Sequence, residues 1–414
     1  HWISDRTGWW NLYNQDGHLA PMDAEFAGPD WIFGQSTYTF LSDGRLVATW
    51  SEAGMARVGV VDGSGQVTPV TTPFTSLLSL QAGTGPEVVA IAASPTEAPA
   101  VVAIDVESGL RGANAMAPVR VLKPSRSTPP PVEALSTPRP VAYPSSGRTA
   151  HAFYYEPRLE GFEGPEGQRP PLIVRSHGGP TSAAQTALNL EIQFWTSRGF
   201  GVVDVDYGGS TGYGREYRRL LDGQWGIVDL DDCVNAARYL AGTGEVDPDR
   251  LVVRGGSAGG YTTLCALTFR DIFATGASYY GVADLETLAR DTHKFESRYL
   301  DRLIGPYPER RDLYMERSPI HAAGGISAPV ILLQGLEDKV VPPSQAEILV
   351  DALRANGVPF AYVTFQGEQH GFRSAAAITR AVSAELSFYG QVLGFEPAGG
   401  IEPVEIEHAD RLRR

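Results

Sequence analysis

The feature that most constrains this chain is a short apolar run that leads into a glycine-rich turn with a serine at its tip. Residues 251–254 have the pattern of a buried β-strand, and residues 255–260 read Gly-Gly-Ser-Ala-Gly-Gly before a helix-compatible stretch. Such a turn holds Ser257 in a strained backbone conformation, which only small neighbouring residues allow. The arrangement predicts a nucleophile elbow, in which a helix N-terminus directs N–H groups towards a developing oxyanion. The competing interpretation is a glycine-rich turn with an incidental serine.

The composition narrows the classes of protein to which this chain can belong. The 414 residues carry a formal net charge of −14, which argues against a polyanionic partner such as nucleic acid. No apolar run is long enough to cross a membrane as a helix, so no membrane partner is expected. Cys233 and Cys265 lie in apolar, helix-like surroundings, which predicts buried thiols rather than a disulfide. The chain starts at His1 without a signal-peptide pattern, and the cytoplasm is therefore the expected default location.

Residues 1–120 have the pattern of β structure, in which short apolar runs alternate with turns rich in Gly, Asp and Asn. Two similar segments, 59–65 and 103–109, end in such turns and lie roughly 45 residues apart. This spacing predicts the blades of a β-propeller, and the alternative is an unrelated β-sandwich. About two to three blades fit into 1–120, whereas a closed propeller needs at least about four. We therefore expect the preceding part of the propeller to have been removed or to exist as a separate chain.

A proline-rich linker at 121–140 separates this region from a differently patterned one. Within 141–396, short apolar runs alternate with amphipathic helical patterns, which predicts a mostly parallel sheet with helices on both faces. The strand–turn–helix around Ser257 makes this an α/β-hydrolase domain. The remaining residues, 397–414, form a polar tail. The predicted fold class is thus an α/β-hydrolase preceded by the last blades of a truncated β-propeller.

A serine nucleophile needs an imidazole base and a carboxylate that fixes the imidazole tautomer. In the predicted fold these partners follow the serine in the order acid, then histidine. Four histidines follow Ser257 in the chain: His293, His321, His370 and His408. His370 lies just after the expected last strand, 360–365, which makes it the candidate base. The first two precede the strands that should carry the acid, and His408 lies in the polar tail. The alternative for His370 is an exposed loop histidine.

The candidate acid lies after the preceding expected strand, 329–334. Glu337 and Asp338 are adjacent there, and the residues alone leave the choice between them open. The shorter side chain of Asp338 suits a tight, preorganised contact with an imidazole. The alternative is an ordinary charged loop. Asp284 follows a different strand and is expected to cap a helix.

Stabilising an oxyanion requires two N–H donors near the serine. Ala258 N–H, directly after Ser257, is one candidate. Gly179 N–H, in the His-Gly-Gly-Pro segment 177–180, is the other, because glycine lets the backbone approach a substrate carbonyl. His177 has no second His or Cys at ligand spacing, so a metal site is not expected. The predicted chemistry requires neither a metal nor a cofactor.

Five separate motifs, in order along the chain, resemble the prolyl oligopeptidase family of serine peptidases. They lie at 177–180, 206–214, 255–261, 335–342 and 368–372, and the branch they resemble most is that of acylaminoacyl and dipeptidyl peptidases. The resemblance implies Ser257, Asp338 and His370 as the catalytic triad. Where prolyl oligopeptidase uses a tyrosine hydroxyl in its oxyanion hole, this chain has His177, so the resemblance implies a backbone N–H donor instead. It also implies an N-terminal propeller that restricts entry to short peptides.

A primary specificity pocket is expected from residues that follow the elbow and the next strand: Tyr280, Val282, Phe295 and Tyr299. The alternative is that these side chains belong to the core. The expected activity is hydrolysis of short peptides, or of N-acylated or dipeptidyl N-termini, through an acyl-enzyme. The alternatives are a carboxylesterase with the same triad and a non-catalytic binding module with a hydrolase fold. The type of exopeptidase and the oligomeric state, a homo-oligomer included, are left open.

Overall fold

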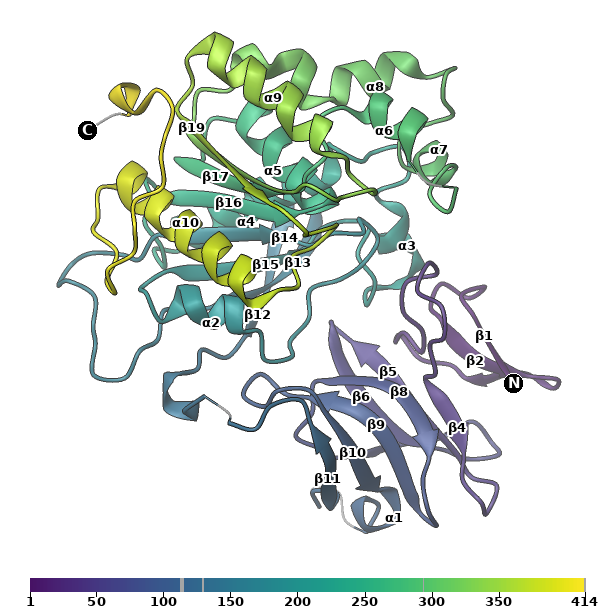
Figure 1. Cartoon of the computed structure of the whole chain (residues 1–414). Coiled ribbons are helices and arrows are strands. Elements are labelled where there is room, and N and C mark those ends of the chain that lie inside the picture. Colours follow the sequence, from purple (N-terminus) through teal and green to yellow (C-terminus); the bar gives the residue numbers. More distant parts are fainter. Residues whose placement is uncertain (112–114, 129, 293, 413–414) are drawn as a thin grey trace.

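The computed structural model describes residues 1–111, 115–128, 130–292 and 294–412 (Figure 1). Pro129 of the predicted linker, His293 and the two final arginines lie outside the described residues. An N-terminal region of antiparallel sheets lies beside a larger region with a mixed sheet and most of the helices (Figure 1). Within the described residues, no helix is both long enough and apolar enough to cross a membrane.

The described residues of the N-terminal region form three antiparallel sheets, and in each of them consecutive strands are neighbours. Their strands are β1 (Trp2–Ser4), β2 (Asn11–Asn14) and β3 (Gly17–Ala20); β4 (Tyr38–Phe40), β5 (Leu46–Glu52), β6 (Met55–Val61) and β7 (Val67–Val70); and β8 (Ser76–Ala82), β9 (Glu87–Ala93), β10 (Ala100–Asp105) and β11 (Val119–Pro124). A short helix, α1 (Val106–Gly109), follows β10. The two similar segments of the sequence fall at the third strands, β6 and β10, of two four-stranded sheets. These sheets fit the predicted propeller blades.

The larger region is built around an eight-stranded sheet with the strand order β12-β13-β15-β14-β16-β17-β18-β19. The strands are β12 (Arg139–Ser145), β13 (Arg148–Tyr155), β14 (Leu172–Ser176), β15 (Gly201–Asp206), β16 (Leu251–Gly256), β17 (Thr275–Tyr279), β18 (Val330–Gly335) and β19 (Phe360–Phe365). The first two strands pair antiparallel, and the others run parallel from β15 onwards. The predicted α/β-hydrolase fold class is confirmed. Ligands bind beyond the carboxyl ends of the strands in such sheets.

Helices cover both faces of this sheet (Figure 1). They are α2 (Leu190–Thr196), α3 (Gly214–Arg219), α4 (Val228–Gly242), α5 (Ala258–Phe269), α6 (Leu285–Asp291), α7 (Tyr299–Leu303), α8 (Arg311–Arg317), α9 (Pro343–Asn356) and α10 (Ala375–Leu393), with short 3-10 turns η1 (Val132–Ala134), η2 (Pro319–Gly325) and η3 (Ala409–Arg411). Alternate strand residues face opposite sides. Val174 and Val253 pack with α4, α5 and α9, whereas Ile173 and Val252 pack with α2 and α10. The sheet is therefore buried on both faces, which explains its nearly continuous apolar strands.

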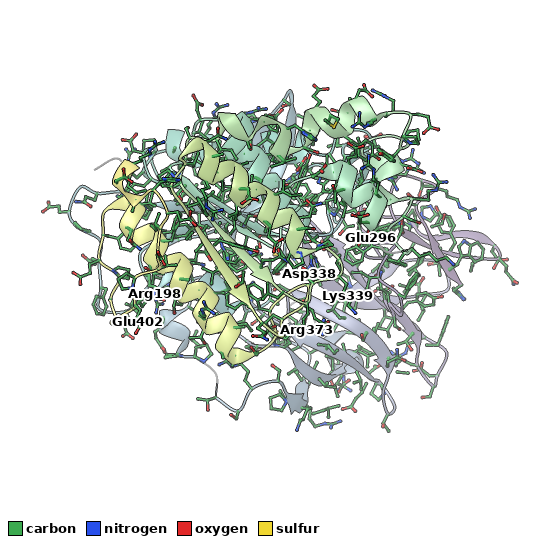
Figure 2. The ribbon with its side chains drawn as sticks, turned by 45° about the horizontal axis from the view of Figure 1, so that its top comes forward. Arg198, Glu296, Asp338, Lys339, Arg373 and Glu402 are labelled. Atoms are coloured by element: carbon green, nitrogen blue, oxygen red, sulfur yellow. The ribbon has the colours of Figure 1, made fainter. Side chains whose placement is uncertain are left out.

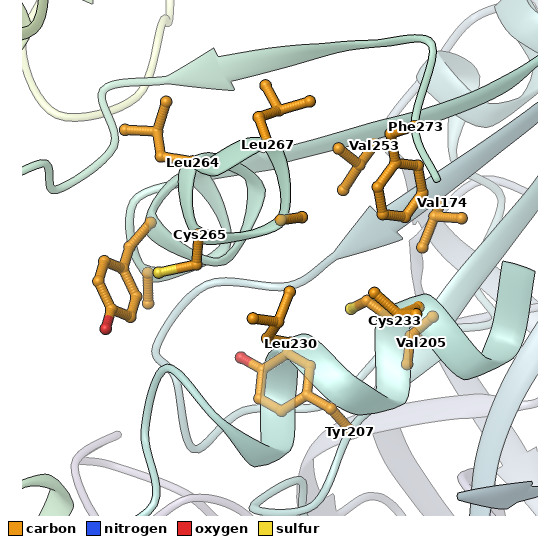
Figure 3. Close-up of a cluster of buried hydrophobic side chains, with 14 of the residues drawn as sticks. Val174, Val205, Tyr207, Leu230, Cys233, Val253, Leu264, Cys265, Leu267 and Phe273 are labelled. Atoms are coloured by element: carbon orange, nitrogen blue, oxygen red, sulfur yellow. The ribbon is translucent and has the colours of Figure 1, made fainter. Parts of the chain in front are cut away.

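The two cysteines lie in the core that is shared by α4, α5 and the sheet (Figure 3). Cys233 on α4 and Cys265 on α5 are both buried free thiols, as predicted. Burial raises the pKa of each thiol well above its usual value, which keeps both protonated and unreactive.

The C-terminal segment packs against the edge of the sheet. Phe360 of β19 exchanges two backbone hydrogen bonds with Glu407, with N···O distances of 3.1 and 2.8 Å. The Glu407 carboxylate also pairs with Arg354 of α9 at 2.8 Å. The segment predicted as a polar tail thus covers the last strand, and Ile406 is buried there.

Candidate active site

The turn between β16 and α5 has the geometry expected of a nucleophile elbow. Ser257 lies between the strand and the helix with φ of 57° and ψ of −121°, a strained conformation for a residue with a side chain. A Cβ atom on Gly259 would lie 2.2 Å from the backbone oxygen of Ser176, and one on Gly255 would lie 2.4 Å from Gly259. The glycines are therefore required because β14, β16 and the first turn of α5 pass so close to one another.

The structure brings Ser257, His370 and Asp338 into one hydrogen-bonded chain. His370 Nε2 lies 2.9 Å from Ser257 Oγ, and His370 Nδ1 lies 2.7 Å from Asp338 Oδ2. The other carboxylate oxygen of Asp338 accepts hydrogen bonds from the N–H groups of Val340 and Val341, at 2.8 and 2.9 Å. The buried carboxylate is thus oriented by its own loop and in turn orients the imidazole.

The acid and the base come from the loops after β18 and β19. These loops touch, since a Cβ on Gly335 would lie 2.6 Å from the backbone oxygens of Glu368 and Gln369. The Glu368 carboxylate accepts hydrogen bonds from the N–H groups of Arg373 (2.7 Å) and Ser374 (3.1 Å). These bonds brace the loop that carries His370. Figure 2 shows Asp338 and its neighbour Lys339 in this loop region.

The predicted oxyanion loop, 177–180, lies against the elbow. A Cβ on Gly178 would lie 3.7 Å from Ser257 Cβ, and Gly179 has φ of 119°, in the region that favours glycine. Ala258 is the first residue of α5, so its N–H lies at a helix N-terminus. Both predicted donors therefore belong to segments that adjoin Ser257.

The side chain of His177, the first residue of the oxyanion loop, is buried and helps to hold this loop in place. Its Nε2 lies 2.7 Å from Ser210 Oγ, and its ring stacks on Tyr207 with centroids 4.2 Å apart. The Tyr207 hydroxyl lies within hydrogen-bond distance of the backbone oxygens of His177 and Pro180, both at 2.9 Å, and shares its one proton between them. Burial lowers the pKa of His177 to about 4, so this imidazole is neutral at pH 7. Among the residues the structure describes, no group of three or more His, Cys, Asp or Glu side chains could hold a metal ion.

Ser257 and His370 open into a cavity of about 810 Å³. A second, smaller pocket of about 40 Å³ adjoins it behind Ser257 and has a largely apolar wall. The smaller pocket is lined by Gly179, Pro180, Trp225, Ser257, Ala258, Val282, Leu288, Thr292, Glu296, Tyr299, Leu300, Val340 and Val341. A large cleft beside the nucleophile with one small apolar recess is the arrangement expected for binding one side chain of an acyl group.

Comparison with known proteins gives the family of this chain. Residues 186–396, about half of the sequence, match the family profile described as the prolyl oligopeptidase family. The chain belongs to the prolyl oligopeptidase family. The resemblance inferred from five sequence motifs is thereby confirmed.

The curated relatives of this member of the prolyl oligopeptidase family include exopeptidases. It is 30% identical over 240 residues to dipeptidyl aminopeptidase BIII of Pseudoxanthomonas mexicana, and the aligned residues cover 56% of this chain and 34% of the relative. It is 29% identical over 215 residues to the acylamino-acid-releasing enzyme of Arabidopsis thaliana, and the aligned residues cover 49% of this chain and 28% of that relative. The chain thus spans about a third of the length of these curated relatives.

Solved structures resemble nearly the whole chain. A puromycin-hydrolyzing peptidase of Mycobacterium tuberculosis superposes with a TM-score of 0.92 at 44% identity, and the match covers 98% of this chain and 61% of that peptidase. A puromycin hydrolase superposes with a TM-score of 0.91 at 41% identity, and the match covers 97% of this chain and 61% of that hydrolase. The acylaminoacyl peptidase of Pyrococcus horikoshii, with a TM-score of 0.74 at 21% identity over 91% and 57% of the two chains, shares the fold.

The four residues predicted for a specificity pocket of this family member all line the two cavities. Tyr280 and Phe295 line the larger cavity, Val282 lines the smaller pocket, and Tyr299 lines both. The Tyr280 ring meets His370 edge-on, with centroids 4.9 Å apart. The Tyr299 hydroxyl donates to the backbone oxygen of Gly179 at 2.9 Å and so connects α7 to the oxyanion loop. Their part in specificity stays a prediction.

Sequence reasoning missed an aromatic contact from the N-terminal region to the cleft. Trp31 lines the larger cavity, and its Nε1 donates to Thr181 Oγ1 at 3.2 Å. Phe33 meets Phe295 edge-on, with ring centroids 5.6 Å apart. The three consecutive large apolar residues Trp31, Ile32 and Phe33 were the available signal, because contiguous apolar side chains that are exposed on a surface often mark a contact.

A charge network in the wall of the larger cavity was also missed. Arg254, buried in β16, pairs with Glu191 at 2.7 Å and with Glu385 at 2.8 Å. Burial alone would raise the pKa of Glu191, but the guanidinium groups of Arg254 and Arg175 outweigh it and hold that pKa at about 2. An arginine inside an apolar strand next to the elbow was the sequence signal, since a buried charge requires a partner.

Proposed function

We propose that this chain carries the catalytic unit of a serine peptidase that hydrolyses short peptides or aminoacyl amides through an acyl-enzyme. The observation that carries the proposal is the hydrogen-bonded chain from Ser257 Oγ through His370 to Asp338, at the mouth of a cavity that can hold a substrate. Membership of the prolyl oligopeptidase family supports the same chemistry.

In the first half-reaction, Ser257 Oγ attacks the carbonyl carbon while His370 Nε2 takes the hydroxyl proton. The N–H groups of Ala258 and Gly179 hold the resulting oxyanion. The carboxylate of Asp338 stabilises the imidazolium and keeps its Nδ1–H directed away from the serine. When the tetrahedral intermediate collapses, His370 returns the proton to the leaving amine and the acyl group remains on the serine.

In the second half-reaction, a water molecule takes the place of the amine. His370 removes a proton from this water as it attacks the acyl carbon, and the second collapse restores Ser257 and releases the acid. No step requires a metal ion or a cofactor.

The substrate class is proposed from the cavity and from the relatives. Trp31 and the Phe33–Phe295 contact narrow the cleft from the N-terminal side, which favours short substrates over folded proteins. Two of the similar structures are those of a puromycin-hydrolyzing peptidase and a puromycin hydrolase. We extend that activity to this chain. The proposed gate is a complete propeller, part of which is supplied by residues outside 1–414.

The proposed location is the cytoplasm, because two unpaired cysteines favour a reducing compartment.

The test is Ser257→Ala, assayed on chromogenic amides and by fluorophosphonate labelling. The variant should lose about a millionfold in turnover and all labelling at residue 257. Ser344→Ala, at an exposed serine on α9, is the matched control and should retain both. Ordinary amide turnover by Ser257→Ala would refute the assignment. If the native protein is labelled but turns over only esters, it is a carboxylesterase rather than a peptidase. If it shows neither labelling nor turnover, it is a binding module.

A further inference from the structure

The motif at 206–214, which follows β15, takes no part in the proposed reaction but contacts the oxyanion loop from its buried side. Ser210 Oγ lies 2.7 Å from Nε2 of His177, and the Tyr207 hydroxyl lies 3.1 Å from Nδ1 of the same ring. Ser210 and Tyr207 are both fully buried, and Tyr207 belongs to the core cluster shown in Figure 3. The His177 ring is therefore held at both nitrogens by a segment that the core keeps in place.

The contacts of the ring determine which tautomer the neutral His177 adopts. Nδ1 lies 2.9 Å from the backbone oxygen of Gly178, and a carbonyl oxygen can only accept, so Nδ1 carries the proton. Nε2 is then an acceptor, and the Ser210 hydroxyl donates to it. The opposite tautomer would place a lone pair against Gly178 O. It would also draw the Tyr207 proton to Nδ1, away from the two carbonyl oxygens that share it.

The bond from Nδ1–H sets the direction of the proposed oxyanion donor, the N–H of Gly179. The Gly178 carbonyl and the Gly179 N–H belong to one planar trans peptide unit, so these two groups point in opposite directions. Because the buried ring of His177 binds the carbonyl, the N–H is directed away from the ring, towards the cavity that both glycines line. Among the described residues no protein acceptor is bonded to this N–H, which leaves it available to a substrate oxygen.

The peptide unit between two glycines needs such a bond because no side chain restricts its rotation. Turning this unit over would exchange its N–H and its C=O, and the carbonyl oxygen would then face the place where the oxyanion forms. The Tyr299 hydroxyl donates to the oxygen of Gly179 at 2.9 Å, which fixes the following peptide unit instead. Of the groups that the structure describes, only the His177 ring binds the Gly178 oxygen.

We propose that His177 is a positioning residue whose Nδ1–H holds the Gly178–Gly179 peptide unit, so that the Gly179 N–H points at the oxyanion. Ser210 takes part by donating to Nε2, which keeps the ring proton on Nδ1. This inference rests on the proposed function and adds two residues that act on the reaction through a backbone group. Stabilisation of the oxyanion thus depends on the tautomer of a second imidazole, as proton transfer depends on that of His370.

Asn and Gln variants test the two ring nitrogens separately. The amide nitrogen of Asn is bonded to Cγ and can donate from the place of Nδ1, whereas that of Gln is bonded to Cδ and reaches the place of Nε2. On a chromogenic amide that the native protein hydrolyses, His177→Gln should lower kcat by about tenfold to a thousandfold and change KM by less than about threefold. His177→Asn should recover most of this loss. His321→Gln, at an exposed histidine in η2, is the control and should keep both constants.

A second measurement reads the tautomer itself and does not depend on activity. In protein with isotope-labelled histidine, NMR correlations between the ring nitrogens and the carbon-bound ring protons distinguish a protonated nitrogen from an unprotonated one. The signal of His177 is identified by its absence in His177→Asn, and it should show the proton on Nδ1. Ser210→Ala removes the donor to Nε2, so it should shift part of the ring population to the opposite tautomer and lower kcat.

The outcomes distinguish failure of this inference from failure of the proposed function. A native spectrum with the proton of His177 on Nε2 would overturn the inference, also if His177→Gln does not fold. Equal losses of kcat in folded His177→Asn and His177→Gln, or losses confined to KM, would overturn it as well, and in each case the proposed function stands. Amide turnover that does not depend on Ser257 would overturn both.

Discussion

The replacement of Asp338 by Asn tests the tautomer argument at the candidate triad. Asp338 Oδ1 accepts two backbone N–H bonds, and Oδ2 lies 2.7 Å from His370 Nδ1. An Asn can keep its oxygen on the two N–H groups, but its NH₂ then faces the imidazole. His370 Nδ1 must become the acceptor, the proton moves to Nε2, and the base can no longer accept a proton from Ser257.

The expected loss follows from that change. A wrong tautomer in an otherwise intact triad costs about 10⁴-fold in kcat, equal to about 5 kcal/mol of transition-state stabilisation. Since the two N–H bonds of the acid loop survive, the free energy of unfolding should change by only about 1 kcal/mol. The assays are kcat on alanine p-nitroanilide, the rate of fluorophosphonate labelling and urea unfolding of the same preparations.

The adjacent residue supplies the control. Glu337 is exposed, and the carboxylate bonded to His370 is that of Asp338, so Glu337→Gln should keep kcat within about twofold of the native value. A loss below about tenfold in Asp338→Asn, or a comparable loss in Glu337→Gln, would refute the reasoning. The comparison also decides experimentally between two acids that adjacent positions in the sequence could not separate.

Two further predictions concern stability. Gly259→Ala should lower the free energy of unfolding by about 1–3 kcal/mol, because the added Cβ would lie 2.2 Å from Ser176 O. Gly242→Ala is the control and should be tolerated, because a Cβ there would have nothing within 4 Å. Urea unfolding of both variants measures the difference. The pKa of His177 falls from 6.5 to about 4 on folding, so the unfolded chain binds the proton first as the pH drops, and stability present above pH 6.5 is lost towards pH 4. The difference in unfolding free energy between the native protein and His177→Gln should therefore shrink by about 2 kcal/mol from pH 7 to pH 5, and a constant difference would contradict the buried neutral imidazole.

The fold class was predictable because its signals are local. A buried strand, a turn of small residues and a helix around Ser257 can be recognised without knowing what surrounds them. The repeat between 59–65 and 103–109 likewise reflects hydrogen bonding within each sheet. The division into a domain at 1–120, a linker, a domain at 141–396 and a tail stays a prediction, although the C-terminal segment packs on β19 through Glu407.

The candidate site was predictable in part. Chain order and strand ends pointed to His370 and to the pair at 337–338, because a parallel sheet collects the carboxyl ends of its strands at one edge. The residue types could not say which acid turns inwards. That depends on the backbone of the acid loop, whose N–H groups at 340 and 341 hold Asp338.

The sequence by itself thus determined the elbow, the order of the candidate triad and the propeller-like sheets. Each of these follows from residue patterns over a few positions or from fixed chain order. Only the tertiary structure decided that Trp31 reaches the cleft, that Arg254 pairs with Glu191 and Glu385, and that Glu296 lies where two cavities meet. These contacts join segments far apart in the chain. They depend on how loops pack around the sheet, and no local pattern of residues encodes that packing.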